Sequence, residues 1–298
     1  MKTDNLIFQL ITNNMRGKKE SVLNPDSLGN GLESRIRIAQ GRVNGIKNYS
    51  SIFCASNNLN PITTTQRTWG MPASSNHNLV SYLDTATTLG IASTNINDTI
   101  IGTGARQITI SGLDSNWNRK SELISLNGQS RVNTLTNFLR INLIIVEDVG
   151  SANRNLGDIF ISDSTDTFTL GIPTTKTLFA MLGSTDAANP SNISTFGSRS
   201  VSAYHRLWLI KGNYYTSATQ SKVLVIKEDY YAESSLGNRI QYTGGPLLFS
   251  GSVSFGFDGA ASFAPKTDYN FKVYSSNTTI NGSLYYEAVE EDTRDLTT

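Results

Sequence analysis

The sequence predicts an all-β protein, and three observations lead to that fold class. Charged residues are only 16% of the 298-residue chain, and Asn, Ser, Thr and Gly, which favour turns and strands over helices, fill the difference. Apolar and polar residues alternate in many short segments, the pattern of a strand with one buried face. No long segment combines helical periodicity with helix caps. We therefore expect two β-sandwich (jelly-roll-like) domains, residues 32–172 and 173–298, after an extended N-terminal arm, residues 1–31.

The N-terminal arm begins with an apolar run and continues as a polar linker. Residues 13–31 are rich in Gly, Asn and Lys and have no periodicity. Such a composition buries too little apolar surface to order itself. We expect the arm to order only in an assembly, where it ties one subunit to its neighbour. The alternative is a first strand of the same domain.

The first domain is predicted to begin with the alternation of Ile36 and Ile38 and to contain a long loop at residues 57–78. Trp69 in this loop is a candidate anchor for packing or for an interface. Ile108 and Ile110 alternate with polar residues and predict a strand that ends in the turn residues 112–116.

Asn127-Gly128 is the strongest hairpin signal in the chain, because both residues tolerate the positive φ of a type I′ turn. It follows a strand expected at residues 122–126. Residues 139–146 carry apolar groups on both faces, which predicts a strand covered on both sides. A turn is expected at Lys211-Gly212-Asn213. Further strands are expected at residues 157–168, 207–209, 222–227, 249–257, 269–273 and 280–289.

The sequence carries no recognisable catalytic or cofactor motif. It lacks the glycine-rich nucleotide signatures and the zinc-protease and serine-hydrolase motifs. Cys54 is the single cysteine, so neither an internal disulfide nor a cysteine-based zinc site can form. The two histidines, His77 and His205, are far apart in sequence. We predict no enzymatic activity and no cofactor.

The charge and hydropathy of the chain argue against nucleic-acid and membrane partners. The net charge is +1, which gives no field to attract a phosphate backbone. No apolar stretch approaches the length of a membrane span, and no signal peptide is present, so we expect synthesis in a cytoplasm. Asp158, Asp163 and Asp166 leave a calcium site open as an alternative, but the calcium-loop pattern of spacing is absent.

Several short sequence words between residues 41 and 161 resemble a family of β-rich virion structural proteins of tailed, notably marine, phages and some large algal viruses. Pro265-Lys266-Thr267-Asp268 resembles the family's C-terminal part. The words of the longer span are Gly41-Arg42-Val43-Asn44-Gly45, Thr68-Trp69-Gly70, Asn97-Asp98-Thr99, Gly102-Thr103-Gly104-Ala105-Arg106-Gln107-Ile108-Thr109-Ile110, Gly112-Leu113-Asp114, Ser121-Glu122, Leu126-Asn127-Gly128, Phe138-Leu139-Arg140-Ile141-Asn142 and Asn155-Leu156-Gly157-Asp158-Ile159.

The resemblance implies a virion component without catalytic residues, located in the head, the neck or the tail. We expect a capsid or capsid-associated subunit, such as a vertex, decoration or connector protein, that assembles with its own copies and other virion proteins into a symmetric oligomer. The candidate interface residues are Trp69, Arg106, Trp117 and Arg140. Arg106 and Arg140 are expected to pair with Glu122 or Asp114 across the sheet.

The alternative from the binding class is a fibre-like adhesin that recognises a host glycan. Trp117, Trp208 and four tyrosines offer rings on which sugars stack, although such rings are equally ordinary in sandwich cores and interfaces. A polysaccharide-degrading virion enzyme is the third hypothesis, and no acid/base pair can be named for it.

Overall fold

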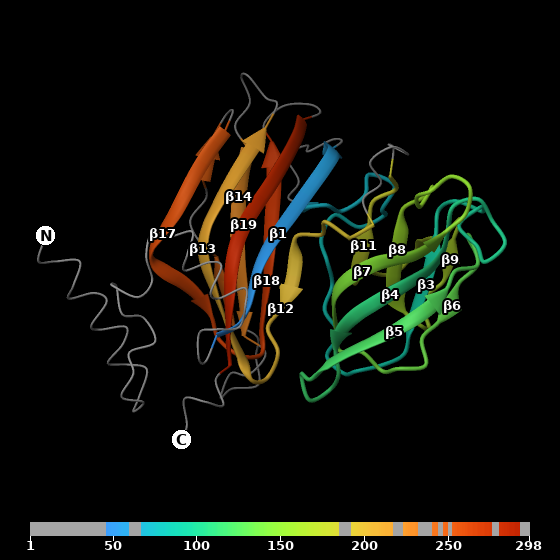
Figure 1. Ribbon diagram of the computed structural model, residues 1–298, viewed down its shortest axis with the longest axis horizontal. Helices are drawn as coiled ribbons and strands as arrows, with labels where there is room; N and C mark the ends of the chain where they lie inside the picture. The colour runs from blue at the N-terminus through green and yellow to red at the C-terminus, as the bar shows by residue number, and fades with distance from the viewer. Residues whose placement is uncertain are drawn as a thin grey trace, which may run out of the picture.

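The computed structural model describes residues 46–59, 67–184, 192–216, 223–231, 240–243, 247–249, 252–275 and 280–292. Every regular element in these ranges is a β-strand, which confirms the predicted all-β class. The strands form two bodies that lie side by side (Figure 1). The predicted arm, residues 1–31, lies outside the described residues, as does the alternation at residues 35–38.

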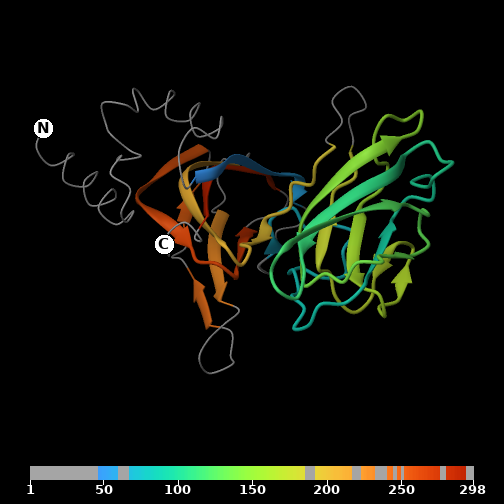
Figure 2. The ribbon, with the colours of Figure 1, turned by 60° about the horizontal axis from the view of Figure 1, so that its bottom comes forward.

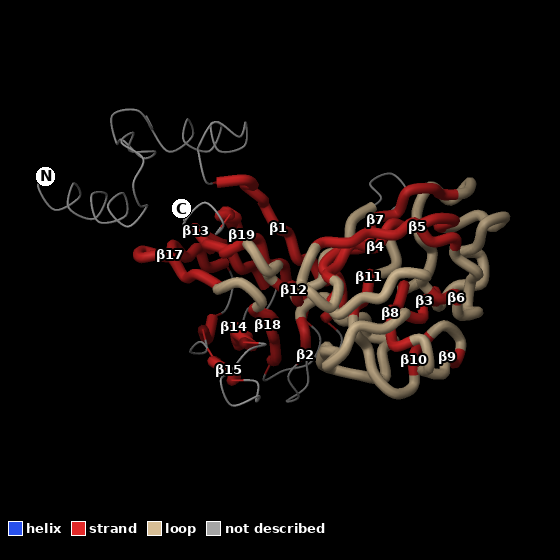
Figure 3. Tube along the Cα trace, turned by 90° about the horizontal axis from the view of Figure 1, so that it is seen from below, coloured by secondary structure: helices blue, strands red, loops and turns tan. Residues whose placement is uncertain are grey.

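The first domain contains two facing antiparallel sheets, ordered β11-β8-β3-β6 and β5-β4-β7, and a small hairpin of β9 and β10. Figure 3 shows the sheets as two layers, with β4, β5 and β7 on one side and β3, β8 and β11 on the other. The strands are β3 (Leu89–Ser93), β4 (Ala105–Leu113), β5 (Arg119–Ser125), β6 (Val132–Asn133), β7 (Arg140–Val149), β8 (Ile159–Asp163), β9 (Phe168–Thr169), β10 (Ile172–Pro173) and β11 (Phe179–Met181).

One apolar core fills the space between these two sheets. Ile108 and Ile110, which the alternation placed on one face of β4, are fully buried there. They share the core with Ile91 of β3 and Phe160 of β8. All five residues of β3 and the first four of β8 are buried, so these two strands lack a solvent face and read as nearly continuous apolar runs.

The second domain also has two layers, which Figure 2 shows edge-on beside the first domain. One sheet has the order β1-β19-β13-β17, and the other contains β12-β18-β14-β15, with β16 on β14 and β2 on β18. The strands are β1 (Ile46–Leu59), β2 (Arg67–Thr68), β12 (Ser198–Ser200), β13 (His205–Thr216), β14 (Val223–Tyr231), β15 (Ile240–Thr243), β16 (Leu247–Phe249), β17 (Ser252–Phe263), β18 (Thr267–Ser275) and β19 (Ile280–Asp292).

The strand pairing departs from the predicted domain boundaries at both ends of the first domain. β1 was expected in the first domain but pairs along its whole length with β19 of the second. In Figure 1 the blue β1 lies beside the red β19. Conversely, β11 was expected in the second domain but pairs with β8 of the first. The first domain is therefore inserted between β2 and β12, and local alternation cannot reveal a pairing between strands so distant in sequence.

Two of the three predicted turns also need correction. The turn after β4 joins β4 to β5 as expected, with Trp117 at a φ of 61°. Gly128 does have a positive φ of 58°, but Asn127-Gly128 does not close a hairpin, because β5 and β6 belong to different sheets. Lys211, Gly212 and Asn213 lie inside β13, where a shift in register accommodates them.

Candidate functional site at the junction of the two domains

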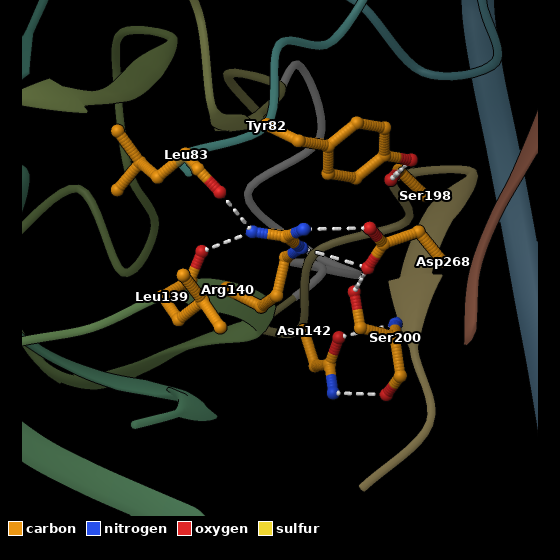
Figure 4. A network of polar contacts seen from close by, with 8 residues as sticks. All are labelled: Tyr82, Leu83, Leu139, Arg140, Asn142, Ser198, Ser200 and Asp268. Carbon is orange, nitrogen blue, oxygen red and sulfur yellow. Dashed lines mark hydrogen bonds and ion pairs between the residues drawn. The ribbon is translucent and has the colours of Figure 1, made fainter. Parts of the chain in front are cut away.

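The junction between the domains is built around a buried ion pair of Arg140 and Asp268. Arg140 begins β7 of the first domain, and Asp268 lies in β18 of the second, 128 residues further along the chain. The Nε and Nη2 atoms of Arg140 donate to Oδ1 and Oδ2 of Asp268, each over 2.7 Å. This two-point geometry matches the planar guanidinium to the planar carboxylate and fixes their relative orientation (Figure 4).

The remaining surroundings of Arg140 come from the first domain and the loop before it. Nη1 donates to the carbonyl oxygens of Leu83, at 2.7 Å, and of Leu139, at 2.8 Å. The guanidinium carbon lies 5.0 Å from the ring centres of both Tyr82 and Trp117, a cation–π arrangement. Four of its N–H groups are thus occupied, which offsets the cost of removing the charge from water.

A second set of hydrogen bonds holds Asp268 from the side of β12. The Ser200 hydroxyl donates to Oδ1 of Asp268 over 2.5 Å. Asn142 of β7 binds the backbone of Ser200 twice, because its amide donates to the carbonyl oxygen at 2.8 Å and its side-chain oxygen accepts from the N–H at 2.7 Å. β7, β12 and β18 are therefore locked to one another by side chains (Figure 4).

Three of the four predicted interface residues, Trp69, Trp117 and Arg140, are buried within the chain. Trp69 is fully buried, and its backbone N–H donates to the carbonyl oxygen of Phe271. Trp117 and Arg140 are also buried, 6% and 5% exposed. Within the single chain these three side chains are covered by the chain itself, and their role as contacts for a second subunit stays a prediction. Trp117 is likewise too buried to serve as a platform for sugar stacking.

The predicted pairing of the two arginines across the sheet is also wrong. Arg106 is half-buried, and its Nε donates to the carbonyl oxygen of Gly102 at 3.1 Å. Glu122 accepts the backbone N–H groups of Leu135 and Thr136, each at 2.8 Å. Asp114 caps its own turn and lies 3.8 Å from the Lys120 ammonium. The structure gives both acids local partners, and the partner of Arg140 comes from the second domain.

A second buried carboxylate, Asp98, organises the first domain, and no cationic side chain pairs with it among the described residues. Its two oxygens accept the backbone N–H groups of Ala105, Leu156 and Gly157 at 2.8–2.9 Å and the Ser93 hydroxyl at 2.6 Å. Its own carbonyl oxygen accepts the Gly128 N–H at 2.7 Å. Asp98 is fully buried, so these neutral donors replace its hydration.

Glycine is required next to this carboxylate because the backbone approaches it closely. A Cβ atom on Gly104 would lie 2.0 Å from Oδ1 of Asp98, well inside contact distance. Sequence reasoning assigned no role to Asp98, although it stands in one of the words that carry the resemblance. Asp268 stands in another, Pro265-Lys266-Thr267-Asp268. The sequence words therefore include both aspartates, but they do not show which residues each aspartate contacts.

The three aspartates weighed as a calcium site point to separate partners. Asp158 accepts the Gly183 N–H and the Ser74 hydroxyl. Asp163 accepts the N–H and the hydroxyl of Thr165. Asp166 accepts a hydroxyl from Ser162 and backbone N–H groups from residues 175–176. Among the described residues, no group of three His, Cys, Asp or Glu side chains is arranged to hold a metal ion.

The two histidines contact different hydroxyl groups. Nδ1 of His77 lies 3.1 Å from Oγ1 of Thr177, and Nδ1 of His205 lies 2.6 Å from Oγ of Ser202. Ser202 and His205 also share a backbone turn, since the His205 N–H donates to the Ser202 carbonyl oxygen.

Within the described ranges, no helix has the length and apolar character of a membrane span.

Comparison with known proteins gives no family for this chain. No protein-family model matches it, and no curated protein matches it. It is similar to the solved structure of the infectious bursal disease virus Gx strain, at 9% identity over 87% of this chain and 81% of that one, with a TM-score of 0.22.

A VP2 subviral particle of infectious bursal disease virus matches at 10% identity over 88% and 78%, with a TM-score of 0.19. The insecticidal delta-endotoxin Cry8Ea1 from Bacillus thuringiensis matches at 7% identity over 96% and 68%, with a TM-score of 0.15. TM-scores this low do not establish a shared fold.

Proposed function

We propose that this chain is a non-enzymatic structural subunit of a virus particle, capsid or capsid-associated, that assembles with copies of itself and with other virion proteins. The observation that carries the proposal is where the resembling words lie in the structure. Several of the words that lie among the described residues meet in the interior and join the chain to itself.

Two groups of words support this reading. Asp98 binds the backbone of Ala105, Leu156 and Gly157, so three words converge on one carboxylate. Arg140, from a fourth word, binds Asp268, from the C-terminal one. Residues used in this way preserve a shape, which is what a building block of a symmetric shell or ring has to keep constant.

The junction adds a mechanical argument. Three sets of contacts hold the two β-sandwiches in one orientation. They are the two-point ion pair of Arg140 and Asp268, the two aromatic rings over the Arg140 guanidinium, and the hydrogen bonds between Asn142 and Ser200. A subunit that bends freely at its middle cannot present two faces at a fixed angle to its neighbours. A rigid two-domain unit can, and this geometry therefore supports an assembly role.

The test is the assembly state of the purified full chain. Native mass spectrometry and negative-stain electron microscopy over a concentration series should show one closed oligomer of fixed copy number. A chain that stays monomeric at every concentration and is absent by mass spectrometry from washed particles of its virus would refute the proposal. New reducing ends released from host polysaccharide would refute its non-enzymatic part.

A further inference from the structure

A cleft of about 410 Å³ lies between the two domains. One wall is the end of the β5-β4-β7 sheet, which contributes residues 111–113, 119–121 and 142–143. The opposite wall consists of β12 and the residues after it, together with Leu207, Tyr269 and Glu290 of the second domain. Its volume falls within the range of small-molecule sites, roughly 300–1,000 Å³.

The charged side chains of the cleft are mostly cationic. Arg119, Lys120 and Arg199 line it, against Glu290 as the single acid among the lining residues. Arg119 pairs with Glu290 across the two walls. Lys120 has its ammonium 3.8 Å from Asp114, which is an ion pair but too long for a hydrogen bond. The lining residues thus include three cationic side chains and one acid, a balance that favours an anionic group.

The wall from the first domain also presents hydroxyl groups. Ser111 and Ser121 are directly opposite each other on β4 and β5, which brings their Cβ atoms to about 5 Å. Neither hydroxyl has a hydrogen-bond partner among the described residues. Leu143 adds apolar surface on the same wall, and Leu207 adds apolar surface from the opposite wall. Free hydroxyls next to apolar patches suit a molecule that carries both O–H groups and C–H faces.

We propose that this cleft binds a short acidic saccharide, a sugar that bears a carboxylate. The carboxylate lies toward Lys120 and Arg199, the sugar hydroxyls exchange hydrogen bonds with Ser111 and Ser121, and a C–H face of the ring rests on Leu143. A neutral sugar would lack the charge-assisted contact, and an inorganic anion would lack the hydroxyl and C–H contacts. The proposal adds a ligand site to the structural role and does not depend on it.

The experiment measures binding of three probes to the full chain by saturation-transfer NMR and calorimetry. The probes are glucuronic acid, glucose and sodium sulfate. Lys120→Gln removes one cleft cation, and Lys176→Gln is its matched control. Lys176 also has one loose ion pair with a nearby aspartate, 3.7 Å from Asp163, and it does not line the cleft.

Glucuronic acid should bind at least about tenfold more tightly than glucose, because one charge-assisted contact is worth about that factor. It should also bind more tightly than sulfate, which lacks the hydroxyl and C–H contacts. Lys120→Gln should weaken it about tenfold, and Lys176→Gln should leave it unchanged. Ser121→Tyr, a substitution on an exposed strand position, should abolish binding while the melting temperature stays that of the wild type.

Three results would overturn the proposal. The first is no saturable binding of glucuronic acid. The second is equal binding of glucuronic acid and sulfate, which would reveal a simple anion site. The third is an equal effect of the two lysine variants, which would place the site elsewhere.

Discussion

Two carboxylates, Asp98 in the first domain and Asp268 at the junction, are buried away from water, and different partners replace the hydration of each. Asp98 is held by three backbone N–H groups and one hydroxyl, all neutral. Asp268 is held by a guanidinium that is itself buried. The first arrangement ties loops of one domain together, and the second ties two domains together. The difference teaches that neutral donors suffice within one domain, whereas the carboxylate that joins the two domains is matched by an opposite charge.

The largest effect is expected from removing the carboxylate at the junction. Asp268→Ala leaves the Arg140 charge buried without a counter-ion, which should lower the free energy of unfolding by about 3–5 kcal/mol. Urea unfolding of the full chain measures it. The double variant Arg140→Met/Asp268→Leu should lose much less, because no charge is then stranded. A loss below about 1 kcal/mol in Asp268→Ala would show that the pair does not hold the junction.

A smaller loss is expected when Asp98 is replaced without a change of shape. Asp98→Asn turns one acceptor into a donor that faces backbone N–H groups, so we expect a loss of about 2–3 kcal/mol in the free energy of unfolding. Asn97→Ala is the control, since that side chain is exposed and should change stability by less than about 0.5 kcal/mol. The contrast between the two centres fails if Asp98→Asn costs more than Asp268→Ala.

Asp166 extends the comparison to pH, because it too is held by neutral donors. Burial by itself raises its pKa, but hydrogen bonds from Ser162, from Thr175 and from the backbone of Lys176 outweigh burial and lower the pKa to about 2. In the unfolded chain the pKa is about 3.9. The stabilisation is therefore complete above about pH 4 and is lost as the pH falls toward 2.

Unfolding in urea at a series of pH values between 2 and 5 checks this sign. Asp166→Asn should have a shallower dependence of unfolding free energy on pH than the wild type. Identical slopes would mean that the hydrogen bonds to this carboxylate do not distinguish its charged form.

The smallest effect is expected at the exposed edge of the same junction. Arg119 and Glu290 also form an ion pair between the domains, but the Arg119 side chain is 51% exposed. Arg119→Ala should change the free energy of unfolding by only about 0–1 kcal/mol, and less at high salt, because water and ions screen the pair. A loss as large as that of Asp268→Ala would mean that burial does not set the strength of these two pairs.

Local patterns in the sequence were enough to predict many of the longer strands of the fold. Alternation at Ile108 and Ile110 gave β4, and apolar groups on both faces gave β7. The strands near residues 222–227, 269–273 and 280–289 are confirmed as β14, β18 and β19. Each of these predictions uses only residues that are close together in sequence. In a strand, alternate residues lie on the same face, so the alternation itself shows which side chains are buried.

Pairings between distant segments could not be predicted in this way. β1 pairs with β19, and Arg140 pairs with Asp268, because the whole fold brings them together. Asn127-Gly128 shows the same limit, since Gly128 adopts the expected φ while the strands on either side join different sheets. Residue type decides which local conformation a segment adopts. The tertiary arrangement decides which other segment it pairs with.

Calorimetric unfolding of the full chain tests most directly whether the junction makes one unit of the two domains. The wild type should give a single transition whose calorimetric and van't Hoff enthalpies agree, and Asp268→Ala should give two separated transitions. Two transitions in the wild type would contradict the rigid two-domain unit on which the assembly role is built.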